Sequence, residues 1–370
     1  MTTRGRLLGL AVASVVLLAG CSAPAVAPRP TPVVATSSAP PDPRLSSSTA
    51  LLTATLDPTQ PGCSAAVAVH GTLVWAAAVG TADLTTGAPL TTETRFDIAS
   101  LTKQFTATAV LVLQREGKLS LSDPISSYVS GLPAWGKTVT LDALMHHTSR
   151  VPDYWKKLGD WGYGFQTPAT QADALRAIKA VPSLLSGSGY AYSNSNYILL
   201  AQVIERVTGE PYAQYVTETI FEPLGLQMQI DPVLQSPDIA VSYDKANRPT
   251  RNAWAFYGAF GTFTTPTQLA LWGDQYRESD LVGNDFVAGA VDSGEPGEVT
   301  EGRVYAAGIN INADGSLRHD GRLGGFLSAI KISPDRETTV AVACNGELAD
   351  RSAVVNGLYS LWVDPEPGGD

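Results

Sequence analysis

A serine and a lysine three residues apart are the residues of this sequence best suited to chemistry. Ser100 and Lys103 stand at the start of an apolar segment with helical spacing, so the hydroxyl and the amine face the same side, one turn apart. A serine hydroxyl is a poor nucleophile at neutral pH and needs a neighbouring base. Because an amine desolvated in a cleft loses its proton more easily, this pair predicts nucleophilic catalysis on Ser100.

The same spacing occurs twice more, and local structure distinguishes the three copies. Ser328 and Lys331 lie in a strand-like segment, where residues three apart point to opposite faces. Ser242 and Lys245 lead into a turn-like stretch that favours a surface loop. Only the copy at Ser100 is followed by apolar residues at helical spacing, which supports a buried helix.

Two further short motifs contain polar side chains suited to a site. Tyr192 and Asn194 precede a predicted helix from about residue 195 to 207, and His319 is followed two residues later by Gly321. Taken singly, the first motif is typical of a helix cap with a packed aromatic ring. Taken singly, a histidine before a glycine is typical of a solvated turn.

Taken in order, the three motifs resemble those of the serine β-lactamase and penicillin-binding-protein superfamily. Surrounding segments over most of residues 57–360 are most similar to the class C β-lactamase branch. That branch includes D-alanyl-D-alanine carboxypeptidases, D-amino-acid peptidases and esterases. The resemblance implies a β-lactamase/transpeptidase-like fold and an acyl-enzyme mechanism.

The resemblance also implies a role for each motif residue. Ser100 would be the acylated nucleophile, and either Lys103 or Tyr192 would be its base. The two bases would titrate as a coupled unit. Because the sequence has no separate glutamate motif for deacylation, the Tyr192 route is favoured. The expected substrate-binding groups are Asn194, His319 as a polar or cationic group, Gly321, and the main chain of Arg322, whose N–H would form an oxyanion hole with that of Ser100.

Three positions depart from the pattern of the resembled family. Asp320 replaces the threonine or serine of strict β-lactamases, so we expect it to repel substrate carboxylates if it faces the cleft. Arg150 stands where relatives have glycine, and Phe260 stands where a small residue is usual and would narrow a pocket. Because of Asp320, we expect an esterase or a D-Ala-type peptidase ahead of a true β-lactamase.

The N-terminus predicts export and a lipid anchor. Residues 1–20 combine a basic start with an apolar run and small residues before Cys21, which resembles a bacterial lipoprotein signal peptide. Cys21 would become the lipidated N-terminus of a protein held outside the cytoplasm at the cell membrane; an ordinary cleaved signal is the alternative. Residues 21–48 are rich in proline, alanine and serine and predict a tether.

Residues 49–365 predict one hydrolase domain of the α+β class. Strand-like segments occur near both ends of this range, and helical patterning dominates a lobe at about 101–240. An antiparallel sheet built from both chain ends, with the helical lobe inserted, follows from this order. The active cleft is expected between the two lobes.

The two cysteines that remain after Cys21 predict a disulfide. Cys63 begins one strand-like run and Cys344 ends another, so antiparallel neighbouring strands would bring them together. Disulfides are common in exported proteins.

The charge pattern excludes some classes of partner. The formal net charge of −10 repels phosphate backbones, so nucleic acid is not an expected partner. No spacing of ligand residues indicates a metal site, and the chemistry requires no cofactor. We therefore expect a lipid-anchored serine hydrolase acting on a small-molecule or peptidoglycan-type ester, amide or lactam. The alternative is a catalytically silent relative that binds cell-wall material or a partner protein.

Overall fold

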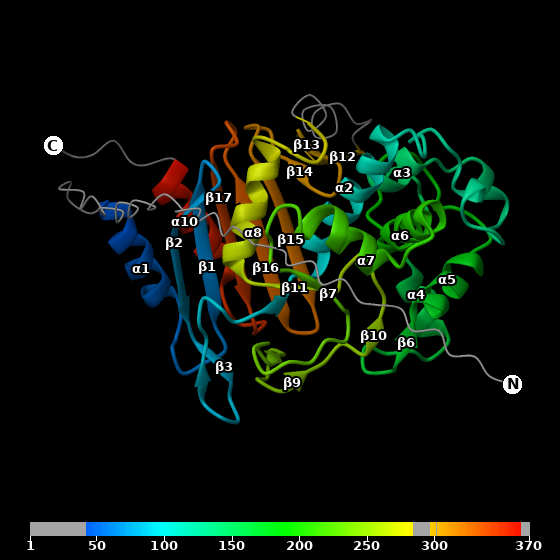
Figure 1. The fold of residues 1–370 in the computed structure, drawn as a ribbon. Helices are drawn as coiled ribbons and strands as arrows, with labels where there is room; N and C mark the ends of the chain where they lie inside the picture. The colour runs from blue at the N-terminus through cyan, green and yellow to red at the C-terminus, as the bar shows by residue number, and fades with distance from the viewer. Residues whose placement is uncertain (1–41, 284–296, 301, 364–370) are drawn as a thin grey trace, which may run out of the picture. The chain divides into compact units, whose positions relative to one another are not determined.

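The computed structural model describes residues 42–283, 297–300 and 302–363 (Figure 1). They belong to a compact unit that begins at Asp42. The expected signal peptide, Cys21 and the tether as far as residue 41 lie outside the described residues. None of the helices within the described ranges has the length and apolar character needed to cross a membrane.

The main sheet has eight antiparallel strands and is built from both ends of the described chain. The last strand of the sheet in sequence, β17 (Thr338–Cys344), pairs with the first, β1 (Cys63–Val69), so the two ends of the described chain meet within the sheet. In spatial order the strands are β12 (Gly297–Thr300), β13 (Arg303–Tyr305), β14 (Asn310–Ile311), β15 (Leu317–Leu323), β16 (Phe326–Ile332), β17 (Thr338–Cys344), β1 (Cys63–Val69) and β2 (Thr72–Val79). This order confirms the predicted sheet topology.

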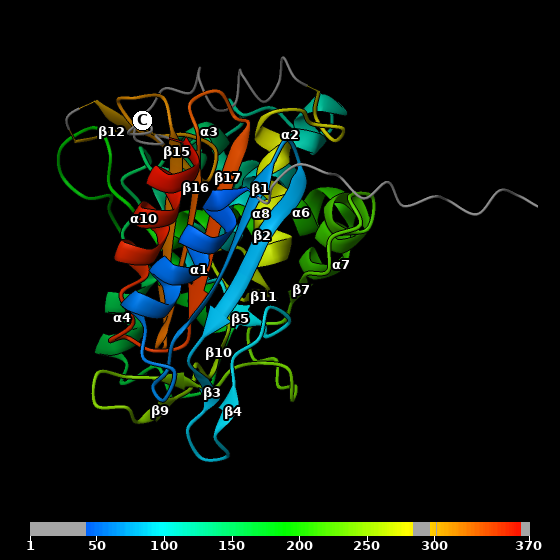
Figure 2. The same ribbon diagram turned by 90° about the vertical axis from the view of Figure 1, so that its left-hand side faces the viewer.

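The two terminal helices pack together against one face of this sheet, as Figure 2 shows. They are α1 (Pro43–Thr55) and α10 (Arg351–Val363), and their apolar residues share a core with β1 and β17. Helix α8 (Pro266–Trp272) lies on the other face (Figure 2). Both faces of the central strands are therefore covered, which explains why β17 is buried along its whole length.

Helix α1 corrects the expected boundary of the tether. It begins at Pro43, with Asp42 as its N-cap, inside the segment expected to be a tether as far as residue 48. Ser48 is fully buried, and its hydroxyl accepts a hydrogen bond from the indole N–H of Trp362 at 2.9 Å. The folded domain therefore begins at about residue 42 rather than 49.

The middle of the chain forms the helical lobe, seen on the right of Figure 1. Its helices are α2 (Thr102–Arg115), α3 (Leu141–Met145), α4 (Tyr154–Asp160), α5 (Gln171–Lys179), α6 (Asn194–Thr208) and α7 (Tyr212–Val216). Short strands complete the fold: β3 (Thr81–Asp83), β4 (Ala88–Pro89), β5 (Phe96–Asp97), β6 (Ala169–Thr170), β7 (Gln229–Ile230), β8 (Ser242–Tyr243), β9 (Pro249–Thr250), β10 (Trp254–Ala255) and β11 (Thr262–Thr264). The predicted α+β class is confirmed.

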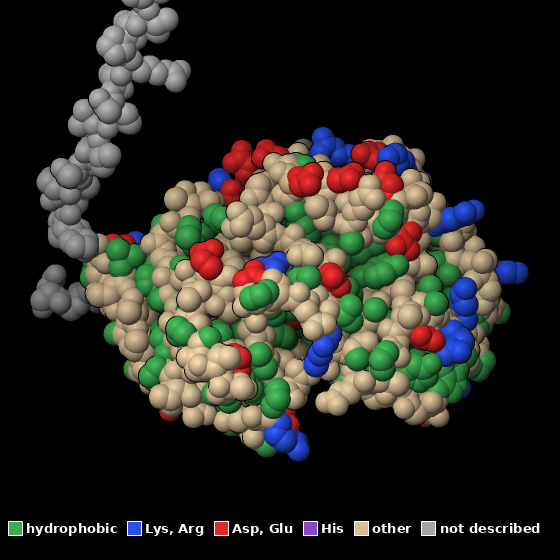
Figure 3. Space-filling model, turned by 60° about the horizontal axis from the view of Figure 1, so that its bottom comes forward, with side chains coloured by type: hydrophobic (Ala, Val, Ile, Leu, Met, Phe, Trp, Pro, Cys, Tyr) green, Lys and Arg blue, Asp and Glu red, His purple; other side chains and the backbone are tan. Residues whose placement is uncertain are grey.

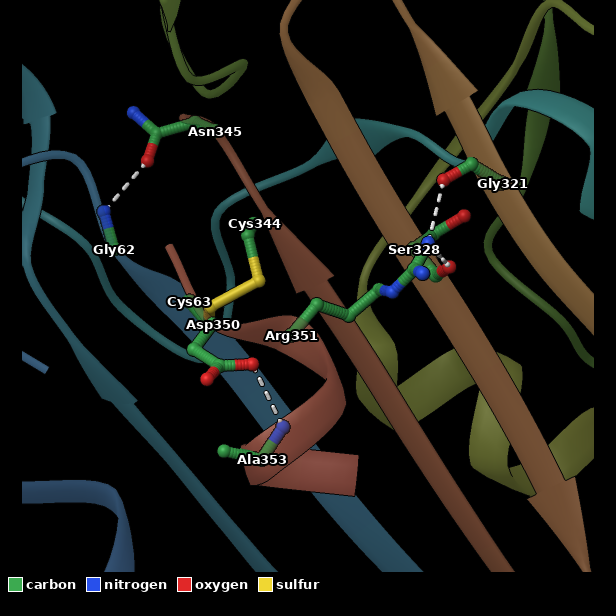
Figure 4. Close-up of a disulfide and its surroundings, with 9 residues drawn as sticks. All are labelled: Gly62, Cys63, Gly321, Ser328, Cys344, Asn345, Asp350, Arg351 and Ala353. Atoms are coloured by element: carbon green, nitrogen blue, oxygen red, sulfur yellow. Dashed lines mark hydrogen bonds between the residues drawn. A yellow bond between two sulfur atoms is a disulfide. The ribbon is translucent and has the colours of Figure 1, made fainter. Parts of the chain in front are cut away.

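The structure joins Cys63 and Cys344 in a disulfide (Figure 4). The two residues are directly opposite each other in the β1–β17 ladder, with their Cα atoms 4.0 Å apart. The bond closes a loop with a sequence separation of 281 residues, so it fastens the start of the domain to its last strand.

Candidate active site

Ser100 lies in a short 3-10 turn, Ala99–Leu101, that leads directly into helix α2. Lys103 follows one turn later and is fully buried, with its Nζ 3.1 Å from the Oγ of Ser100. Most of α2 is buried, as its apolar residues indicate. The structure therefore places the hydroxyl and the amine on the same side of the helix, as their spacing predicts.

The amine of Lys103 contacts three oxygen acceptors. Besides Ser100, it donates to Oδ1 of Asn194 at 2.9 Å and to the main-chain oxygen of Ala259 at 2.8 Å. Burial lowers the pKa of Lys103 from 10.5 to about 7, and the charge of Asp153 offsets part of this effect. The amine is therefore poised to exchange a proton near neutral pH.

Tyr192 lies just before helix α6, with its hydroxyl 3.0 Å from the Oγ of Ser100. Although 38% of the residue's surface is exposed, desolvation raises the pKa of Tyr192 above its ordinary value of 10. Both expected bases thus reach the same hydroxyl. Electrostatics favours Lys103 over Tyr192 as the base in the free protein, which is opposite to the preference drawn from the sequence.

Asn194 is held by a residue that the sequence motifs do not reveal. Its main-chain N–H and its Nδ2 both donate to Oδ2 of Asp153, at 2.8 and 2.9 Å. Asp153 also caps helix α4 by accepting the N–H of Trp155 at 3.1 Å. The aspartate therefore orients the amide so that its oxygen faces Lys103.

His319 occupies strand β15 rather than the solvated turn that its short motif, taken singly, favours. Pairing of β15 with β16 overrides the poor strand propensity of its local sequence, and only 4% of His319 is exposed. Its Nε2 accepts from the hydroxyl of Tyr305 at 3.1 Å, and its Nδ1 donates to the main-chain oxygen of Asp320 at 2.8 Å.

Burial, and then the charge of Lys103, lower the pKa of His319 to about 4. The ring is neutral at ordinary pH, and both of its nitrogens have protein partners. Of the two roles expected of His319, this favours a neutral polar group over a cationic one. The buried tyrosine that holds it, Tyr305, was not identified from the sequence.

Gly321 permits a close approach between β15 and the turn that carries Ser100. A Cβ atom at this position would lie 2.2 Å from the Oγ of Ser328 and 2.4 Å from the main-chain oxygen of Ile98. Any larger residue would push the strand away from the turn. Gly321 and the following Arg322 both line the same cleft as Ser100.

The cleft has a volume of about 650 Å³. Five expected site residues line it, whereas Lys103 and His319 lie behind its wall. The lining residues are Ser100, Trp155, Tyr192, Asn194, Lys245, Asp320, Gly321, Arg322, Leu327, Glu347 and Arg351. Within the described ranges, no group of three histidine, cysteine or acidic side chains is placed to hold a metal ion.

Asp320 faces this cleft, but its charge is offset by two arginines. Its carboxylate accepts from Nε and Nη2 of Arg318 at 3.0 and 3.1 Å, and Nη2 of Arg351 lies 3.4 Å away. Arg351 also donates to the main-chain oxygens of Gly321 and Ser328, each at 3.0 Å (Figure 4). The repulsion expected of Asp320 toward a substrate carboxylate is therefore much reduced.

The other charges of the cleft include both signs. Arg322 and Glu347 form an ion pair at 2.9 Å, and Lys245 lies exposed in the lining. The cleft lining thus holds three basic and two acidic side chains. Figure 3 shows one face of the molecule, where acidic and basic side chains are interspersed without forming a continuous basic patch.

The remaining departures from the resembled family have structural explanations. Arg150 adopts a left-handed conformation with a φ of 60°, which glycine adopts without strain and which therefore explains the glycine expected at this position. The guanidinium of Arg150 donates to the main-chain oxygen of Ser186. Phe260 is buried, and its ring centroid lies 6.1 Å from that of Phe256. Because Phe260 packs in the core and does not line the cleft, the expectation that it narrows the substrate pocket is wrong.

The comparisons with known proteins agree with this geometry. The family model described as Beta-lactamase matches residues 50–360. Penicillin-binding protein 4* of Bacillus subtilis is 33% identical over 161 residues, covering 42% of this chain and 35% of that protein. Protein flp of Staphylococcus aureus is 27% identical over 315 residues, covering 77% of this chain and 59% of that protein. The chain therefore matches only part of the length of both relatives.

A solved structure shows the same fold. FmtA from Staphylococcus aureus superimposes with a TM-score of 0.74 at 22% identity, covering 89% of this chain and 91% of that chain.

Proposed function

Because the chain belongs to the Beta-lactamase family, we propose that it is a serine hydrolase that opens an ester, amide or lactam through an acyl-enzyme on Ser100. The observation that carries the proposal is the position of one hydroxyl between two proton-transfer groups. The Oγ of Ser100 lies 3.1 Å from Nζ of Lys103 and 3.0 Å from the hydroxyl of Tyr192. These distances suit proton transfer in both directions.

In the proposed acylation step, the neutral amine of Lys103 accepts the proton of Ser100 as Oγ bonds to the substrate carbonyl carbon. The proton then passes, directly or through Tyr192, to the leaving group as its bond to that carbon breaks. The main-chain N–H groups of Ser100 and Arg322 would bind the negative oxygen that develops. Deacylation reverses this order, with water in place of the leaving group.

The buried residues behind the cleft would position these groups. Asp153 orients the amide of Asn194, whose other expected contact is the substrate. His319, neutral and bonded to Tyr305, would support the strand that carries Gly321 and would not bind substrate as a cation.

The charges of the cleft are compatible with a substrate that carries a carboxylate. Lys245 lies exposed in the lining, and Arg351 faces the same cleft as the already neutralised Asp320. Trp155 and Leu327 add apolar surface beside them. We therefore place lactams level with D-Ala-type peptides and neutral esters, although the sequence had placed an esterase or a D-Ala-type peptidase ahead of a β-lactamase.

Location is a separate part of the proposal and rests on the N-terminal sequence. Residues 1–20 would be a lipoprotein signal peptide, Cys21 the lipidated residue, and residues from 21 to about 41 the tether of a domain that ends near residue 365. Radiolabelled palmitate should be incorporated by the chain expressed in a bacterium and lost in Cys21→Ala. Equal incorporation by the variant would contradict the anchor.

The catalytic proposal is tested by treating the full chain with a fluorophosphonate probe and, in parallel, with a penicillin. Intact mass should show one adduct in the wild type and none in Ser100→Ala. The variant should unfold at nearly the same temperature, because a cleft hydroxyl contributes little to packing. Equal labelling of the variant would contradict Ser100 as nucleophile, and no adduct from either reagent would favour the silent binding protein.

A further inference from the structure

A second cavity of about 290 Å³ lies behind the turn that carries Ser100. It shares no lining residue with the catalytic cleft. Two chain segments separate the spaces: the turn that starts at Asp97 and the end of the β15–β16 hairpin. Leu323 and Phe326 of that hairpin line the cavity, whereas Arg322 and Leu327 line the cleft.

The walls of this cavity are largely apolar. Phe263 and Phe326 meet edge to face in its lining, with ring centroids 6.5 Å apart, and Leu323 and Ile239 also line it. The volume is near the lower limit for small-molecule sites, which are typically apolar with a few placed polar groups. The cavity is therefore suited to a small molecule with an apolar body.

A single buried carboxyl group accompanies these apolar walls. Asp97 is 2% exposed and lines the cavity. It pairs with Phe263 in the β5–β11 ladder, so the two side chains project to the same face of that ladder. Among the described residues, Asp97 forms no ion pair, and its polar partners are the main-chain N–H groups of Ala99, at 2.8 Å, and Gly261.

Two N–H donors leave part of the acceptor capacity of a carboxylate unused. Burying an ionised carboxylate without a cation is costly, so a cation entering the cavity would be strongly favoured. Among the described residues, the lining contains one other charged side chain, that of Arg251, which is exposed to solvent whereas Asp97 is buried.

We propose that this cavity binds a small apolar molecule with a basic amine, whose ammonium group pairs with Asp97. The amine would fill the unused acceptor positions of the carboxylate, while the apolar body contacts Phe263 and Phe326. The cavity is separate from the cleft, since the two share no lining residue, although Asp97 also accepts the N–H of Ala99 in the turn that carries Ser100.

The test compares three probes of similar size on the full chain by isothermal titration calorimetry at pH 8. We expect 2-phenylethylamine to bind at least tenfold more tightly than 2-phenylethanol, which lacks the charge, and than 3-phenylpropionate, which reverses it. Equal or tighter binding of the alcohol or the acid would overturn the proposal, as would no detectable binding of the amine at millimolar concentration.

Variants identify the place where the amine binds. Asp97→Asn should weaken amine binding at least tenfold, whereas Asp320→Asn, the matched change in the catalytic cleft, should leave it unchanged. Ala240→Leu adds volume at another residue of the lining and should also weaken binding; circular dichroism and thermal unfolding check that each variant folds. Unchanged binding in folded Asp97→Asn or Ala240→Leu, or loss only in Asp320→Asn, would overturn the site.

Proton linkage gives an independent readout. Burial raises the pKa of Asp97 to about 7. The carboxylate form should be about tenfold less populated at pH 6 than at pH 8, so the amine should bind about tenfold more weakly at pH 6. An affinity for the amine that does not change between these pH values would contradict Asp97 as its counter-ion.

Discussion

Replacing Lys103 by methionine should remove a pH dependence of stability that burial of this amine creates. In the folded protein, burial lowers the pKa of Lys103 from 10.5 to about 7. In the unfolded chain the amine is solvated and has its ordinary pKa. Between pH 7 and 10.5 the unfolded chain therefore binds more protons than the folded protein, so the free energy of unfolding rises with pH across this window.

The magnitude follows from the difference between the two pKa values. Below pH 7 the folded protein holds a buried ammonium, and the full difference between the two pKa values lowers the free energy of unfolding by about 5 kcal/mol. Above pH 10.5 the amine is neutral in both states, so it no longer destabilises the folded protein. About 3 kcal/mol of this change falls between pH 6 and pH 9, where most proteins can be studied. Methionine is similar in length and cannot titrate, so its variant should lack this part of the slope.

Urea unfolding of the full chain at pH 6, 7, 8 and 9 measures the effect in both proteins. Subtracting the Lys103→Met values from the wild-type values cancels the groups that titrate alike in both proteins, leaving Lys103 and the histidines whose pKa its charge shifts. The difference should grow by about 3 kcal/mol in favour of the wild type from pH 6 to pH 9. Fluorophosphonate labelling of the wild type should accelerate with a midpoint near pH 7, because the neutral amine is the proposed base.

Parallel stability curves for the two proteins would refute the reasoning, since they would mean that Lys103 has the same pKa in both states. A labelling rate that rises only above pH 9, together with the predicted stability difference, would instead transfer the role of base to Tyr192.

Three further changes test separate parts of the structure. Tyr192→Phe should lower kcat by about 10²- to 10⁴-fold on any substrate found, because it removes a proton-transfer group 3.0 Å from the nucleophile; unaltered turnover would exclude Tyr192 from the mechanism. Replacing Cys63 and Cys344 together by alanine should lower the free energy of unfolding by about 2–5 kcal/mol in urea titrations under oxidising conditions, and an unchanged midpoint would contradict a structural disulfide. Gly321→Ala should slow fluorophosphonate labelling at least tenfold, since its methyl group would lie 2.2 Å from the Oγ of Ser328; wild-type labelling would show that β15 can shift without affecting the site.

The parts of the fold that follow from local periodicity were predictable from the sequence. The helix after Ser100 and the strands that begin at Cys63 and end at Cys344 have clear apolar patterns, and the β1–β17 register places these cysteines opposite each other. The start of the domain was not predicted. Residues 43–48 have the composition of a linker, but they pack against a residue that is distant in sequence: Ser48 bonds to the indole of Trp362, and the guanidinium of Arg44 lies over the same ring.

The candidate site likewise has residues that the sequence predicts and residues that it does not. The serine, lysine and tyrosine stand in recognisable motifs, whereas the groups that hold them have no fixed spacing from these motifs. Asp153 binds Asn194 across 41 residues, and the oxygen of Ala259 reaches Lys103 across 156 residues. His319 is neutral because it is buried and feels the charge of Lys103, and its local sequence predicts neither effect.

Ala99, the residue before the proposed nucleophile, has a strained backbone conformation that neighbouring groups must stabilise. Ala99 adopts a left-handed conformation with a φ of 51°, which costs a non-glycine residue about 1–3 kcal/mol. The surroundings must stabilise this turn: Asp97 accepts the N–H of Ala99, and the carbonyl of the preceding Ile98 accepts from the Oγ of Ser328 at 2.7 Å. Because Ser328 belongs to β16, far from Ser100 in sequence, the position of Ser100 depends on the main sheet as well as on its own turn. A change that opens the sheet far from the cleft should therefore reduce acylation before it unfolds the protein.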